Sequence, residues 1–62
     1  MTSVERALQE RLRELKSSLA DTVASGGAKN WEEYMRLTGQ IIGISQAERF
    51  LSELVDEREA ND

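Results

Sequence analysis

The sequence predicts an all-α protein: an antiparallel two-helix hairpin that is completed by oligomerisation or by docking on a partner. Apolar residues recur at alternating spacings of three and four in two long segments, which is the pattern of helices with one buried side. Two consecutive glycines separate these segments, and the absence of proline with one Phe, one Tyr and one Trp suits long helices better than a sheet. We expect one domain over residues 1–62, with helices at about 3–25 and 31–58 and a loop at 26–30.

The first helix is expected to begin at a capping box, in which Thr2 and Glu5 satisfy free backbone N–H groups. The apolar residues that follow have the spacing of a coiled-coil seam: Val4, Leu8, Leu12, Leu15, Leu19 and Val23. Gly26 and Gly27 should end the helix, because glycine readily adopts the left-handed conformation found just after helices.

The second helix should begin at Asn30, which forms a second capping-box pattern with Glu33. Its seam alternates three and four throughout: Tyr34, Leu37, Ile41, Ile44, Glu48, Leu51 and Val55. Glu48 is the polar member, and we expect it to pair with an arginine such as Arg11 or Arg13, or to lie at the edge of the seam. Because the connection is short, the two helices should be antiparallel neighbours.

A break at Gly43 is the alternative for the second helix. Ser45 and Glu48 make a third capping-box pattern directly after this glycine, so the chain could stop there and restart as a third helix. However, the three-and-four spacing continues past Gly43 without a change of phase, whereas a turn would reset it. We therefore favour one continuous helix.

A second apolar stripe lies beside the seam of the second helix, and a contact between two helices would leave it exposed. Within it, Gly39, Gly43 and Ala47 are spaced four apart, and such an array of small residues allows another helix to approach closely. Each glycine costs about 1 kcal/mol in a helix interior relative to alanine, so the pair suggests a compensating contact. The residues expected to form an interface, including two on a further flank, are Gly39, Gly43, Ala47, Phe50, Leu54, Trp31 and Met35.

Size and composition restrict the function classes. A chain of 62 residues usually needs disulfides, a metal or oligomerisation for stability, and the absence of cysteine and histidine excludes disulfides and the usual zinc sites. Neither a nucleophile with its base nor a glycine-rich phosphate loop is present, so we expect no enzyme activity and no cofactor. The apolar runs are too short for a signal peptide or a membrane span, so we expect a protein that is cytoplasmic when made and has no membrane partner.

The charge balance disfavours nucleic acid as a partner. The chain has 8 basic and 12 acidic residues, a net charge of −4, whereas nonspecific binding to nucleic acid requires a basic surface. The basic residues of the first helix are interleaved with glutamates: Arg6, Arg11, Arg13 and Lys16. A small nucleic-acid-binding regulator built as a hairpin dimer is still the alternative function, since small regulators of plasmid copy number share this architecture.

The stretch from Gly39 to Ser45 resembles the centre of a DNA-binding helix-turn-helix. The match ends at Arg49 and Ser52, where a recognition helix would require buried apolar residues. The residues that follow are acidic, where contacts to phosphates would be needed.

Residues 30–34, 37–44 and Ala47 resemble small helical proteins encoded in the structural gene clusters of tailed bacteriophages. The shared features are a leucine-striped first helix, a short loop, an acidic and aromatic start to the second helix, and a glycine pair four apart before an alanine. The resemblance covers most of residues 5–55 and implies a non-enzymatic structural or adaptor protein, such as a virion or morphogenesis component at the head or head–tail junction. The implied partners are further copies of the chain or a larger viral structural protein, and the implied location is the virion.

Overall fold

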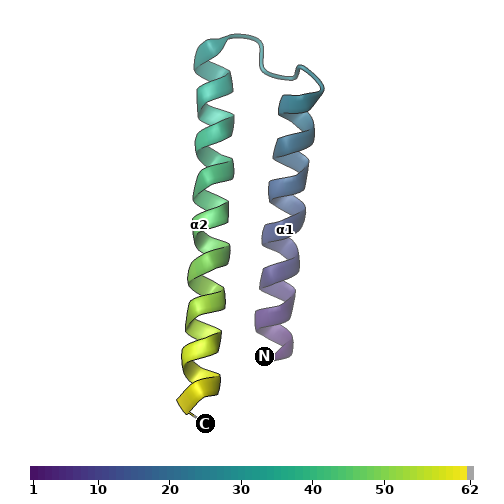
Figure 1. Cartoon of the computed structure of the whole chain (residues 1–62). Helices are drawn as coiled ribbons and strands as arrows, with labels where there is room; N and C mark the ends of the chain where they lie inside the picture. The colour runs from purple at the N-terminus through teal and green to yellow at the C-terminus, as the bar shows by residue number, and fades with distance from the viewer. Residues whose placement is uncertain (62) are drawn as a thin grey trace.

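The computed structural model describes residues 1–61 and consists of two helices that run antiparallel and side by side (Figure 1). Helix α1 spans Ser3–Ala24, and helix α2 spans Trp31–Asn61. The all-α hairpin expected from the sequence is confirmed. The molecule is a rod of 49 × 17 × 12 Å, so it has the thickness of a single pair of helices and no third layer to cover either side.

The start of α1 is the expected capping box. The side-chain hydroxyl of Thr2 accepts a hydrogen bond from the backbone N–H of Glu5 at 3.2 Å. In return, the backbone N–H of Thr2 donates to the Glu5 carboxylate at 3.3 Å. Two N–H groups that the helix leaves without a partner are therefore satisfied by its own first turn.

The end of α1 is a Schellman motif built on the two glycines. Gly26 has a φ of +78°, and its N–H donates to the carbonyl of Val23 at 3.1 Å. The N–H of Gly27 donates to the carbonyl of Thr22 at 2.8 Å. This pair of bonds satisfies two of the last carbonyls of the helix and turns the chain into the loop.

Helix α2 begins with Asn30 as its cap and continues through Gly43 without a break. The side-chain oxygen of Asn30 accepts from the backbone N–H of Glu33 at 2.8 Å, which is the first half of the expected box. The helix ends at Asn61, beyond the expected end near residue 58. It is longer than α1, so its last turns extend past the start of α1 at the end where both termini lie (Figure 1).

The core is the line of contact between the two helices, and it is thin. Among the described residues, only Leu37 and Val55 are buried, with 7% and 6% of their surface exposed, and both belong to α2. The remaining seam residues that are half-buried are Leu12, Leu19, Val23, Ile41, Ile44 and Leu51. None of the α1 residues is buried, so this hairpin leaves part of its apolar seam in contact with water.

The prediction that Glu48 pairs with an arginine is wrong. The carboxylate of Glu48 pairs instead with Lys16, whose ammonium nitrogen lies 2.6 Å from it. Lys16 follows Leu12 by four residues and precedes Leu19 by three, so helical periodicity turns it toward α2. The arginines considered for this role, at 11 and 13, flank Leu12 by one residue on either side and project to the sides of the helix.

Candidate interaction surface

A hollow lies between the two helices on one side of the hairpin. It has a volume of about 450 Å³ and is lined by Leu15, Leu19, Gln40, Gly43, Ile44 and Ala47. Small residues produce it, because Gly43 has no side chain and Ala47 contributes a single methyl group. A Cβ atom placed on Gly43 would meet nothing within 4 Å, so the glycine is not required by the packing of α1 on α2.

Large apolar side chains on the same side of the hairpin continue this surface. Val4 and Leu54 are exposed over 77% and 63% of their surface, and Leu8 and Leu15 over about half. On each helix these residues are four or seven apart, which keeps them on one side of the helix. We call this side the open face, and it comprises Val4, Leu8, Leu15, Gly43, Ala47 and Leu54.

Phe50 borders the open face on α2. Half of its surface is exposed, and the guanidinium of Arg49 lies 5.6 Å from the centre of its ring. Arg49 also approaches Glu53 at 3.8 Å, so charged groups begin immediately beyond the aromatic ring. Phe50 therefore marks the outer edge of the apolar surface.

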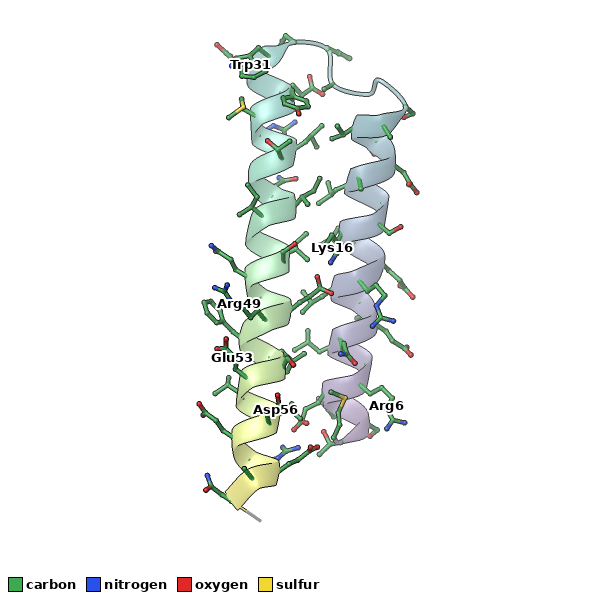
Figure 2. All side chains as sticks on the ribbon, viewed as in Figure 1. Arg6, Lys16, Trp31, Arg49, Glu53 and Asp56 are labelled. Carbon is green, nitrogen blue, oxygen red and sulfur yellow. The ribbon has the colours of Figure 1, made fainter. Side chains whose placement is uncertain are left out.

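The opposite side of the hairpin is polar. Ser45 follows Gly43 by two residues and therefore lies about 200° further round α2, away from the open face. The ion pair between Lys16 and Glu48 bridges the helices, and Figure 2 shows Lys16 between α1 and α2. The two sides thus differ in chemistry along the middle of the hairpin. A second hollow, of about 410 Å³, lies at the loop end, and its lining includes Val23, Ala28, Trp31 and Tyr34.

The remaining expected interface residues lie elsewhere on α2. Trp31 is 71% exposed at the loop end of the hairpin, where its ring stacks on Tyr34 with centroids 5.4 Å apart (Figure 2). Met35 is half-exposed and lies about 120° round the helix from Ala47. Gly39 is exposed, and a Cβ atom on it would meet nothing within 4 Å. The expected interface is therefore divided between the open face and a separate patch near the loop.

Three residues of the open face are on α1, and the sequence interpretation assigned all of them to the seam inside the hairpin. Val4, Leu8 and Leu15 belong to an apolar stripe that is wider than one helix–helix contact can cover. Leu12 and Leu19 take the position facing α2, which leaves the others to one side. Lys16 lies on the other side of the same stripe and pairs with Glu48, so α1 is rotated with Lys16 toward one side and Leu15 toward the other.

Arg6 and Lys16 of the first helix point in different directions. Figure 2 shows Arg6 on the outer side of α1, whereas Lys16 lies between the helices and pairs with Glu48. Arg49 lies on the outer side of α2, away from Arg6. Lys16 is therefore engaged in an ion pair between the helices, and Arg6 and Arg49 project from different helices (Figure 2).

At the end that carries both termini, the helices are joined by charged groups. The guanidinium of Arg58 donates to both carboxylate oxygens of Glu5, one of them at 2.6 Å. This hydrogen bonding lowers the pKa of Glu5 below its usual value of 4.5. The amino group of Met1 lies 2.7 Å from the carboxylate of Glu59. These contacts connect α1 to the last turns of α2 and hold the terminal end of the hairpin closed.

Within residues 1–61, no group of three or more carboxylates is placed to hold a metal ion. In the same part of the chain, neither helix combines the length and the apolar character needed to cross a membrane. The open face is the candidate interaction surface of the described residues, because it combines a hollow with exposed large apolar side chains.

Comparison with known proteins gives no relative: no protein-family model matches the chain, and no curated protein and no solved structure is significantly similar to it.

Proposed function

We propose that this chain is a non-enzymatic structural or adaptor protein that acts by self-association. In this proposal the open face of one hairpin packs against the open face of a second copy, and the two hairpins form a four-helix bundle. The observation that supports it is the concentration of exposed Val, Leu and small residues around the hollow at Gly43. An apolar patch of this kind, bordered by polar groups, is typical of a protein–protein interface.

The exposed area supports a second copy as the occupant. The hairpin exposes 4779 Å², whereas a compact folded monomer of its 7.0 kDa mass exposes about 4000 Å². The excess is roughly 800 Å², which is about what each partner buries in a stable protein–protein interface. Covering the open face would therefore bring the exposed area of each chain close to that of an ordinary globular protein.

Stability supports the same occupant. A two-helix hairpin with only Leu37 and Val55 buried among its described residues has almost no core of its own. Fully burying one large apolar side chain contributes about 1.5–3 kcal/mol, and a self-complementary face would bury four of them on each hairpin. Since each copy brings the same surface, the two-fold contact is closed and does not extend to further copies through the open face.

The resemblance to small proteins of phage structural gene clusters supports a virion or morphogenesis component as the destination of this bundle, at the head or the head–tail junction. Mass spectrometry of purified particles from a phage that carries the gene tests this part of the proposal. Absence of the chain from particles and from assembly intermediates would contradict it while leaving self-association in place.

The self-association itself is tested by charges placed on the two sides of the hairpin. Leu15→Glu and Leu54→Glu each put a carboxylate into the open face, and we expect both to reduce the sedimentation-derived mass to that of one chain. Ser52→Glu is the matched control on the polar side of α2, and we expect it to keep the assembled mass. If the three variants behave alike, the open face is not the surface that associates.

A further inference from the structure

We infer that the second copy packs antiparallel, with Leu54 of each hairpin seated in the hollow formed by Gly43 and Ala47 of the other. This inference rests on the proposed self-association and adds the orientation and the residue that each copy contributes to its partner's hollow. In this orientation, the two-fold axis lies between the two open faces and is perpendicular to the helices. The loops of the two copies then lie at opposite ends of the bundle.

The open face is uneven along its length, and this unevenness selects the orientation. The hollow lies toward the loop, where Gly43 and Ala47 face Leu15 and Leu19. The protruding side chains Val4 and Leu54 lie toward the terminal end. Leu54 follows Ala47 by seven residues, or about 10 Å along the helix, so the protrusion and the hollow are two turns apart.

An antiparallel two-fold arrangement brings each protrusion onto the hollow of the other copy. The axis then passes midway between Leu54 and Ala47, near the level of Phe50 and Leu51. Because Lys16 lies opposite Glu48, the same axis passes near residues 13 and 14 of α1. Leu8 of one copy therefore comes to the level of Leu19 of the other, and both helices contribute to the contact. Protein interfaces of this kind are packed as densely as protein interiors, and this arrangement fills both hollows at once.

A parallel arrangement does not bring the protruding Leu54 onto the hollow of the second copy. Its two-fold axis runs along the helices, so it would place the hollow at Gly43 against the same hollow in the second copy, leaving a void between small residues. It would also set Leu54 against α1 of the second copy, about 10 Å along the bundle from the level of Ala47, so Leu54 would enter neither hollow. Both faults reduce packing density, and close-packed contacts tolerate neither voids nor extra volume well.

Charge also favours the antiparallel arrangement. The last turns of α2 carry four carboxylates and one guanidinium, which belong to Glu53, Asp56, Glu57, Glu59 and Arg58. A parallel pair would place these two acidic ends side by side, where like charges repel one another. The antiparallel pair moves them about 16 Å apart along the bundle, because the axis lies near residues 50 and 51 and the acidic turns are centred near residue 56.

Disulfide cross-linking between single-cysteine variants tests the orientation, because the natural chain contains no cysteine. Leu54→Cys and Ala47→Cys are prepared separately, mixed, re-equilibrated through the unfolded state and treated with a mild oxidant. We expect a disulfide between residue 54 of one chain and residue 47 of the other. Trypsin cleaves after Arg49, so this product is a linked pair of peptides, 37–49 with 50–58, that mass spectrometry identifies. Ser52→Cys, on the polar side, is the matched control and should cross-link to neither variant.

The possible results separate the orientation from the self-association. A disulfide between two copies of Leu54→Cys, formed without Ala47→Cys, would place Leu54 against its own counterpart and not in the hollow, which would overturn the inference while leaving the proposed function intact. A dimer by mass in which none of these pairs cross-links would overturn the inference in the same way. A species with the mass of one chain for the natural sequence, at concentrations where it is fully helical, would overturn the proposed function itself.

Discussion

Gly43 is the residue on which the shape of the open face depends most. It lies in the interior of α2, where glycine costs about 1 kcal/mol relative to alanine, and nothing in the hairpin occupies the space of its missing side chain. The hairpin alone therefore gives no reason for a glycine at this position. A second helix at close range gives one, because it would occupy the hollow that the glycine leaves.

Gly43→Leu should therefore reduce assembly without reducing helix formation. Leucine is a better helix former than glycine, and the Cβ atom it adds meets nothing within 4 Å in the single hairpin. We expect the helical circular dichroism signal per residue to hold or to rise, while the sedimentation-derived mass decreases. Ser45→Leu, with the same side chain on the opposite side of α2, is the control that should keep the mass. An unchanged mass for Gly43→Leu would show that no second chain enters the hollow.

Glu5 gives the hairpin a defined sensitivity to acid. Its pKa is lowered in the folded state by the hydrogen bonds from Arg58, so the folded protein binds the proton less tightly than the unfolded chain does. The stabilisation is present above the usual pKa of 4.5 and is lost as the pH falls through the lowered value. Glu5→Gln should be less stable than the natural chain at pH 7 and equal to it at strongly acidic pH. A difference that stayed constant from neutral to acidic pH would contradict this role of the ion pair.

At the scale of the elements, the two glycines of the loop have separate structural reasons. Gly26 has a positive φ, which costs a residue with a side chain roughly 1–2 kcal/mol. Gly27 has no room for a side chain, because a Cβ atom would lie 2.8 Å from the carbonyl oxygen of Thr22. The end of α1 thus depends on both.

Gly26→Ala and Gly27→Ala should each lower the free energy of unfolding, by about 1 kcal/mol or more. Gly39→Ala is the control, because its added methyl group meets nothing within 4 Å and alanine is the better helix former. Thermal unfolding followed by circular dichroism at one fixed concentration measures all three. A Gly39→Ala variant that lost as much stability as the loop variants would refute this distinction between the glycines.

The elements could be predicted from the sequence because their signals are local. The caps at Thr2 and Asn30 and the phase of the seam through Gly43 require only neighbouring residues, and they led to the right fold. The partner of Glu48 depends on the register between the two helices, which local sequence patterns do not determine. In the structure, this partner is Lys16. The exposed position of Leu8 and Leu15 depends on how far α1 is rotated toward α2, which is also a tertiary property. For this reason the α2 half of the open face was foreseen and the α1 half was not.

At the scale of the whole molecule, we expect the distribution of charge to disfavour nucleic acid as a partner. The net charge is −4, Lys16 pairs with Glu48, and Arg6 and Arg49 lie on the outer sides of different helices (Figure 2). We expect negligible binding to mixed-sequence duplex DNA or RNA at physiological salt in a fluorescence anisotropy titration. Saturable binding below about 1 μM that weakens steeply with added salt would instead support a nucleic-acid-binding regulator, and its loss in an Arg6→Ala, Arg13→Ala double variant would locate the site on α1.

The thinness of the core decides how the molecule is stabilised. A rod 12 Å thick with only two buried side chains in its described part cannot exclude water from the residues of its open face. If those residues are covered by a second copy, folding and association are one process, and the apparent stability depends on the concentration of the chain.

Sedimentation equilibrium of the natural chain, combined with thermal unfolding over a hundredfold range of concentration, tests this account most directly. We predict a molar mass of about twice 7.0 kDa at micromolar concentration, and a midpoint of unfolding that rises as the concentration is raised. A fully helical species of 7.0 kDa that unfolds sharply, at a temperature independent of concentration, would contradict it.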